Sequence, residues 1–234
     1  MRDVRKPDNG IQFSTKRLLF GFICILSLFL FSTSAYSGNY FIDLSQDHWA
    51  FKEIQSLAQE KVISGYPDGT FRPEASITRA EFAKLIVLGK GGLALLSPPR
   101  PAFPDLPRDH WAYRYVETCA AQGWIKGYPD GSFCPDRPVT KAEVLKVIVE
   151  AKRWPIQSNN PVRFLDCMPG EWYYPYLQTA LSFALIKFPD PGFTEEVTKE
   201  GPHFKEVLGY NLRPDLPATR AQVAVLIYRM RFLP

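Results

Sequence analysis

The sequence offers little for catalysis or metal binding. Its 234 residues include only three histidines, His48, His110 and His203, which lie far apart and lack the spacing of metal ligands. Acidic residues are frequent, but no two carboxylates stand out from a pattern that repeats along the chain, whereas a catalytic pair should break such symmetry. We therefore predict no metal site, no cofactor and no enzymatic activity.

Cysteine is also scarce, with four residues in the whole chain. Cys24 lies in an apolar N-terminal stretch, and the remaining Cys119, Cys134 and Cys167 are an odd number that cannot form a full disulfide framework. In an oxidising compartment one pair, such as Cys134 with Cys167, can close and leave one thiol. The alternative, which we favour, is that all three are semi-buried small residues.

An excess of basic residues is missing from most of the chain. The formal net charge is +4, but the first 37 residues hold five basic and two acidic residues, which leaves 23 basic and 22 acidic residues in the rest. A surface that wraps a polyanion needs lysine and arginine clustered on one face. We therefore exclude nucleic acid as a partner.

The N-terminal stretch, residues 1–37, is typical of an export signal. A basic region ends in Lys16-Arg17, an apolar run extends from Leu18 to Phe31, and small residues follow. An uncleaved membrane anchor is the alternative, but the run is shorter than the roughly 20 residues of a spanning helix. In either case we expect an exported protein of the cell envelope, at the cell-wall surface or in the periplasm.

One motif dominates the remaining sequence. The stretch Gly65–Glu81, GYPDGTFRPEASITRAE, recurs 62 residues later as GYPDGSFCPDRPVTKAE, and a damaged third copy follows. Pro67 presets φ for a turn and Gly69 tolerates positive φ, so the motif begins with a structured loop. Thr70-Phe71 is predicted to form a very short extended segment.

The second half of the motif predicts the start of a helix. Thr78 suits the N-cap and Glu81, three residues later, can complete a capping box by reaching back to the Thr78 amide. We expect this helix to run to about Leu88, where Gly89 and the glycines that follow stop it. An earlier helix carries Ile54, Leu57 and Val62 at helical spacing.

The spacing of the copies gives the domain organisation. The second copy matches the first without a gap over Phe103 to Ile148, at a constant offset of 62 residues. A match of this length is strong evidence for a duplicated structural unit. The third copy begins at Phe164 but replaces the GYPDG loop and gains about twenty residues. We predict a leader and three repeats, with these boundaries: 1–37, 38–96, 97–158 and 159–234, the last with an insertion at 194–212.

The patterns FxDxxxxHWA, GYPDGTFRP and ITRAE, repeated along almost all of residues 41–231, resemble the S-layer homology (SLH) domain. The resemblance implies a mainly α fold, in which three pseudo-symmetric repeats of helix, loop or short strand, and helix pack around a central helical bundle. It also implies that grooves between the repeats bind cell-wall polysaccharide, usually a secondary wall polymer that carries the acidic ketal-pyruvate group.

The same resemblance implies that the basic residue of the TRAE motif faces the ligand; here these residues are Arg79, Lys141 and Arg220. The helix dipole disfavours a cation at the N-terminus of a helix, so three such cations indicate a nearby anion. Free amides at the helix N-terminus would favour the same anion. The anion is either a ligand carboxylate or an acidic residue of the fold. We include the acidic candidates in the predicted site: Asp43, Asp105 and Asp166.

Aromatic residues complete the predicted site. Tyr66 and Tyr128, held on the turns, are the favoured residues for stacking on a sugar. Trp49, Trp111 and Trp172 precede helices, where such a residue is more often part of the core than of a binding surface. Because the third repeat lacks the GYPDG loop, we expect at most two working grooves.

The sequence thus predicts a non-catalytic module that anchors to pyruvylated or otherwise acidic cell-wall polysaccharide linked to peptidoglycan. No cargo domain is evident before the last residue, Pro234. The alternative is an envelope protein-interaction or assembly factor that uses the same fold without a working sugar site. In that case the insertion at 194–212 would contact a protein partner.

Overall fold

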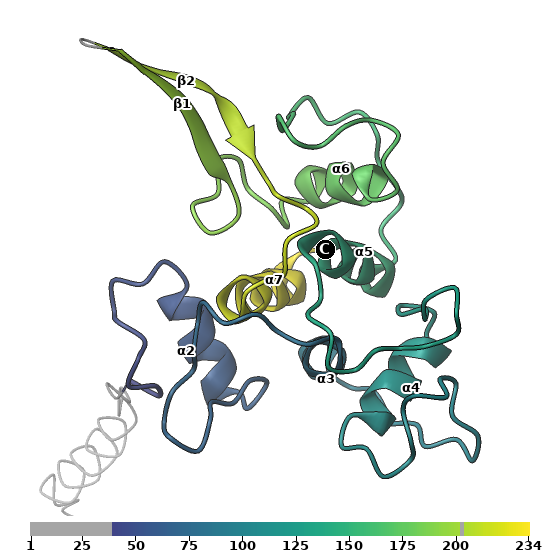
Figure 1. The fold of residues 1–234 in the computed structure, drawn as a ribbon. Coiled ribbons are helices and arrows are strands. Elements are labelled where there is room, and N and C mark those ends of the chain that lie inside the picture. The colour runs from purple at the N-terminus through teal and green to yellow at the C-terminus, as the bar shows by residue number, and fades with distance from the viewer. Residues whose placement is uncertain (1–38, 202–203) are drawn as a thin grey trace, which may run out of the picture. The chain divides into compact units, whose positions relative to one another are not determined.

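The computed structural model describes residues 39–201 and 204–234, and within them the fold is mainly helical, as predicted (Figure 1). The predicted leader, residues 1–37, lies outside the described residues. No helix in the described part is long and apolar enough to span a membrane. The elements are α2 (Phe51–Gln59), α3 (Arg79–Lys90), α4 (Tyr113–Ala121), α5 (Lys141–Lys152), α6 (Tyr174–Ser182), β1 (Glu195–Gly201), β2 (Phe204–Asn211) and α7 (Arg220–Phe232).

Three inner helices, α3, α5 and α7, form the centre of the described unit, and α2, α4 and α6 lie outside them (Figure 1). Helix α4 packs on α3, α6 on α5, and α2 on α7, so each outer helix packs on the inner helix of the preceding repeat. The repeats are therefore closed into a ring, because the first repeat packs on the third. No repeat buries its own apolar faces alone.

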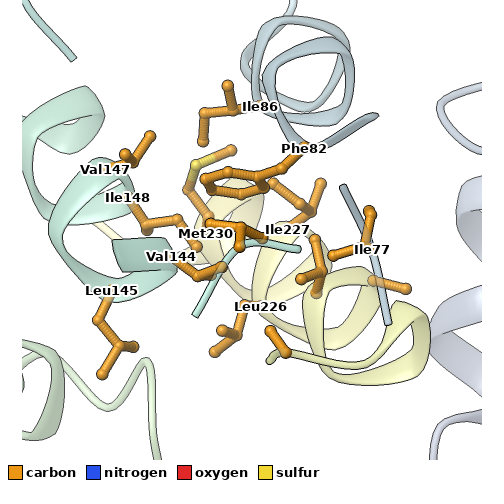
Figure 2. Packing of buried hydrophobic residues seen from close by; sticks show 14 of the residues in the cluster. Ile77, Phe82, Ile86, Val144, Leu145, Val147, Ile148, Leu226, Ile227 and Met230 are labelled. Atoms are coloured by element: carbon orange, nitrogen blue, oxygen red, sulfur yellow. The ribbon is translucent and has the colours of Figure 1, made fainter. Parts of the chain in front are cut away.

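The inner helices meet in an apolar core. Phe82 and Ile86 of α3 face Val144 and Ile148 of α5 and Ile227 of α7, and all five side chains are almost fully buried (Figure 2). Burying side chains of this kind contributes roughly 1.5–3 kcal/mol each. This shared core joins the three repeats into one folding unit.

The predicted capping boxes are confirmed at all three inner helices. Thr78 Oγ1 accepts the amide of Glu81, whose carboxylate accepts the Thr78 amide in return. Thr140 with Glu143 and Thr219 with Gln222 repeat this arrangement. The start of each inner helix is thus encoded locally, by a hydroxyl and a carboxyl or amide three residues apart.

A ring of three backbone hydrogen bonds joins the repeats just before these helices. The Ile77 amide donates to the Ala218 carbonyl at 3.1 Å, the Ala218 amide to Val139 at 2.9 Å, and the Val139 amide to Ile77 at 3.0 Å. The flanking residues form isolated β-bridges, while Thr70-Phe71, where we expected a short strand, is not in one. The extended backbone of each repeat therefore pairs with its neighbours in the ring.

Two predicted helix ends were wrong. Helix α2 ends at Gln59 rather than near Val62, since the chain turns through Lys61 with a φ of 58°. Helix α3 continues through Gly89 to Lys90, because Gly89 lies inside the bundle against Ile227. A Cβ at Gly89 would come within 2.5 Å of Ile227 Cγ2, so this glycine allows α3 and α7 to approach closely.

Gly89 gives a first test of the packing. Gly89→Ala is expected to destabilise the protein, because the methyl group would overlap Ile227, although alanine favours a helix by about 1 kcal/mol. In an Ile227→Ala background the same change should instead stabilise. Chemical denaturation of the four proteins of this cycle measures both effects, and an equal effect in both backgrounds would contradict the close contact.

The insertion at 194–212 forms a β-hairpin that the sequence patterns did not reveal. Strands β1 and β2 pair antiparallel, with an irregularity between Val197 and Thr198, and extend away from the helices (Figure 1). At its base the rings of Tyr210 and Phe188 pack edge to face, with their centres 4.9 Å apart. The Leu165 amide donates to the Tyr210 carbonyl. The hairpin is thus anchored to the third repeat.

Candidate ligand-binding grooves

Each basic residue of the repeated motif reaches into the next repeat of the ring. Arg79 Nε donates to the Phe133 carbonyl at 2.7 Å, and Lys141 Nζ donates to the Leu212 carbonyl at 2.8 Å. Arg220 Nε donates to the equivalent carbonyl of the first repeat, that of Phe71, at 2.7 Å. These contacts define three grooves, which we call A, B and C after Arg79, Arg220 and Lys141 respectively.

Groove A is an open cavity of about 440 Å³. Arg79 lies at its base, 3.3 Å from Glu143 Oε1 and 4.6 Å from the centre of the Tyr128 ring. Lys146 of α5 and Trp172 of the third repeat form another wall, with the ammonium 5.8 Å from the indole ring. All three repeats therefore contribute to this groove.

Groove B repeats this arrangement in a smaller cavity of about 150 Å³. Arg220 of the third repeat lies 3.8 Å from Glu81 Oε1 and 4.9 Å from the centre of the Tyr66 ring. Lys84 and Trp111 line the cavity, in the positions equivalent to Lys146 and Trp172. Grooves A and B thus share one set of residue types.

Groove C differs from the other two, because the chain itself fills the space beside its tryptophan. Trp49 packs on Gly192, where an added Cβ would lie 2.3 Å from the indole ring. The centres of the Trp49 and Phe193 rings are 6.0 Å apart in an edge-to-face arrangement. Gln222 donates its side-chain N–H to the Gly192 carbonyl. Burial lowers the pKa of the Lys141 ammonium, and the enclosed cavity beside it has only about 10 Å³. A more open cavity of about 200 Å³, lined by Lys141, Gly192 and Gln222, remains in this groove.

The aspartates of the predicted site hold loops in place. Both carboxylate oxygens of Asp43 accept backbone amides, those of Phe71 and Arg72, at 2.7 Å. Asp105 and Asp166 bind the equivalent amides of their own repeats in the same way. The alternative that these aspartates pair with the motif cations is not seen among the described residues, because Arg79 and Arg220 pair with capping-box glutamates and all three cations donate to loop carbonyls.

The amides at the helix N-termini are also occupied. The Arg79 amide donates to the Arg137 carbonyl at 2.9 Å and the Ala80 amide to Pro135 at 3.0 Å, and α5 and α7 make the equivalent bonds. The expectation that these amides are free for an anion was wrong. They connect neighbouring repeats instead, so a bound anion has to be recognised by side chains.

Comparison with known proteins identifies the repeated unit. The model of the S-layer homology domain matches residues 41–83 and 102–145. The chain is an SLH-domain protein. The third repeat lies outside the matched residues, but its capping box, its aspartate and its cation make the contacts of the other two.

Curated relatives carry similar sequences within longer chains. A "Cellulosome-anchoring protein" of Acetivibrio thermocellus is 32% identical over 193 residues, which cover 80% of this chain and 42% of that protein. A "Surface-layer 125 kDa protein" of Lysinibacillus sphaericus is 26% identical over 77% of this chain and 14% of its own length. An "Endoglucanase" of a Bacillus species is 30% identical over 47% of this chain and 11% of its own length. The SLH chain thus spans less than half of each of these relatives.

The tyrosines of the SLH loops do not present open rings. Arg72 and Arg220 lie 3.9 and 4.9 Å from the centre of the Tyr66 ring. Arg79 and Arg137 lie 4.6 and 4.9 Å from that of Tyr128. Their role in sugar stacking stays a prediction, although guanidinium groups already lie over the faces of both rings.

In the first loop, hydrogen bonds from Thr70 and Arg72 lower the pKa of the Asp68 carboxyl to about 2.

The tryptophans of the SLH repeats were wrongly expected in the core. Trp111 and Trp172 are 54% and 50% exposed, and each lines a groove between two other repeats. Trp49, at 37%, closes groove C. Their position follows from the ring closure, which no single repeat reveals. The sequence signal for these exposed tryptophans was their recurrence at the same place in each repeat.

The three described cysteines of the SLH chain are unpaired. Burial raises the pKa of the thiols of Cys119 and Cys167 well above the ordinary value. Cys134 is half-buried in the second loop, in the position that Arg72 and Arg213 occupy in the other repeats. The predicted alternative of semi-buried small residues thus fits the structure better than a disulfide between Cys134 and Cys167.

Proposed function

We propose that the protein is a non-catalytic anchoring module that binds an acidic, pyruvylated polysaccharide of the cell envelope in grooves A and B. Cell-surface anchoring through SLH repeats is supported by the family match and by relatives named for anchoring and surface layers. The observation that carries the proposal for the ligand is the shared set of groove residues, two cations, one carboxylate and a half-exposed indole.

The charge of the grooves favours an acidic ligand. In groove A, Glu143 offsets Arg79 and Lys146 leaves one positive charge in excess; Glu81, Arg220 and Lys84 give the same balance in groove B. Arg79 uses three of its five N–H donors within the protein. The remaining donors, together with the lysine, suit one carboxylate of a ligand.

The tryptophans favour a sugar. A half-exposed indole beside two cations offers an apolar face to the C–H face of a sugar ring while the charges hold its acidic substituent. Groove C has lost these features, since Trp49 is packed on Gly192 and Val225 stands where the other helices carry lysine. We therefore propose two working grooves.

Retention on purified cell wall tests this function. Wild-type protein and the variant Trp111→Ala/Trp172→Ala are mixed with pyruvylated wall and with wall from which mild acid has removed the ketal. We expect wild type to be retained on pyruvylated wall alone and the variant to stay in solution. Equal retention of wild type on both walls would contradict recognition of the acidic group. Trp49→Phe, in the filled groove, is the matched control.

The hairpin supports a second candidate function, that of an envelope assembly factor. The hairpin β1–β2 has no counterpart in the other two repeats and extends away from them (Figure 1). Such a strand pair can add a strand of a partner protein at its edge. Deletion of residues 198–207, which keeps Tyr210 at the base, separates the two functions, because it should leave wall retention unchanged and remove only a protein contact.

A further inference from the structure

A fourth groove lies away from the three repeat interfaces, between α4 and the linker that precedes it. Its volume is about 560 Å³, within the range of roughly 300–1,000 Å³ that small-ligand sites occupy. The linker residues Leu96 and Pro98 form one side, and Ala120 of α4 forms part of the other. The walls are mainly apolar, with one acidic side chain, that of Glu117.

Glu117 is a buried carboxylate without a cation. It is 4% exposed, and its Oε1 accepts the Ala102 amide at 2.8 Å. Within the described residues no lysine, arginine or histidine forms an ion pair with it. The nearby Arg114, on the same helix, donates instead to the Leu95 carbonyl. A buried carboxylate left without a cation is costly for the fold.

The other repeats show that the fold does not require this charge. Gln55 occupies the equivalent place in the first repeat and accepts the Tyr40 amide with its neutral oxygen. Gln178 occupies it in the third repeat and is 1% exposed. The Gln178 Oε1 has no hydrogen-bond partner within the described residues, so it is Gln55 that shows that an amide oxygen can hold the linker. The carboxylate is specific to the second repeat, where the open groove lies beside it.

We propose that this groove binds a primary ammonium group on a straight aliphatic chain, with Glu117 as the ion-pair partner and the linker and Ala120 around the chain. The occupant we infer is the diamino-acid side chain of a peptidoglycan stem peptide; this choice of source rests on the proposed wall-anchoring function. The size of the groove suits one side chain with its adjoining backbone. The module then holds the wall by its peptide as well as by its polysaccharide.

Two variants test the site and are expected to leave the stability of the fold unchanged. Glu117→Gln keeps the acceptor for the Ala102 amide, as Gln55 shows, but removes the charge. Ala120→Leu fills the groove, and leucine already occupies the equivalent position, as Leu181, in the third repeat. Both proteins are expected to unfold at denaturant concentrations close to that of the wild type.

The probe is a synthetic stem tetrapeptide that contains lysine, titrated into the full chain by calorimetry, with its ε-N-acetyl form as control. Glu117→Gln or acetylation should weaken binding by about tenfold or more, the loss expected for a charge-assisted hydrogen bond. Ala120→Leu should weaken it as well, because the larger side chain occupies the groove. Equal affinity of wild type and Glu117→Gln, or of the two peptides, would overturn the proposal. A free lysine amide that binds as tightly as the tetrapeptide would overturn the wall peptide as occupant.

The same variants separate this site from grooves A and B. Glu117→Gln should bind pyruvylated polysaccharide as the wild type does, and Trp111→Ala/Trp172→Ala should bind the tetrapeptide as the wild type does. Loss of polysaccharide binding with retained peptide binding would count against the proposed function alone. No detectable peptide binding by a wild-type protein that binds polysaccharide would count against this site alone.

Discussion

The double variant Arg79→Lys/Arg220→Lys is expected to fold normally and to bind pyruvylated polysaccharide at least about tenfold more weakly than the wild type. Lys141 shows that a lysine at this place keeps the bond to the loop carbonyl of the next repeat. A lysine ammonium lacks the planar fork that allows arginine to bind a carboxylate with two donors while a third holds the loop. Calorimetry with a pyruvylated disaccharide measures the loss.

The reverse change provides the control. Lys141→Arg is expected to leave the affinity unchanged, because Trp49 is packed against Gly192 and Val225 stands where grooves A and B carry a second cation. A gain in the number of bound disaccharides on Lys141→Arg would show that the cation, rather than the packing, decides which grooves work. Unchanged affinity of the double variant would show that the two arginines serve only to join the repeats.

The ring of backbone hydrogen bonds predicts the largest loss of stability. Ala218→Pro removes the amide that donates to the Val139 carbonyl at 2.9 Å and leaves that buried acceptor unpaired. The expected loss is roughly 1–3 kcal/mol, against a total of roughly 5–15 kcal/mol for a folded domain. Because all three repeats share the ring, we expect a single, shifted unfolding transition in chemical denaturation.

Ser76→Pro is the matched control for this variant. Pro138 and Pro217 already occupy the equivalent place in the other repeats, and the Ser76 amide makes no backbone hydrogen bond in the described ring. Proline there should be neutral or stabilising by up to about 1 kcal/mol, since it restricts the unfolded chain. Loss of only the third repeat in Ala218→Pro, with the first two still folded, would contradict the closed ring.

Features that depend on a few neighbouring residues could be predicted from the sequence. The capping box of Thr78 and Glu81 follows from two side chains three residues apart, and the structure confirms it in every repeat. The repeated spacing predicted a mainly helical fold of similar units. Arg79 and Arg220 line cavities between repeats, while their contact with a ligand stays a prediction.

Features that depend on the ring closure could not be predicted in this way. Trp172 was predicted in the core from its place before a helix, but it lies beside Lys146 of α5, in the second repeat. The contacts of Asp43 with two loop amides 28 and 29 residues away need the folded loop. Gly89 was wrongly predicted to stop a helix, because its contact, Ile227 of α7, is far away in the sequence.

Recognition of an acidic sugar by grooves A and B is tested most directly by NMR of the five tryptophan indole N–H groups during titration with a pyruvylated disaccharide. The account predicts that the signals of Trp111 and Trp172 shift with saturation while that of Trp49 stays in place. It also predicts no shifts with the same disaccharide after removal of the ketal. Unmoved signals of Trp111 and Trp172, in a protein still retained on pyruvylated wall, would contradict it.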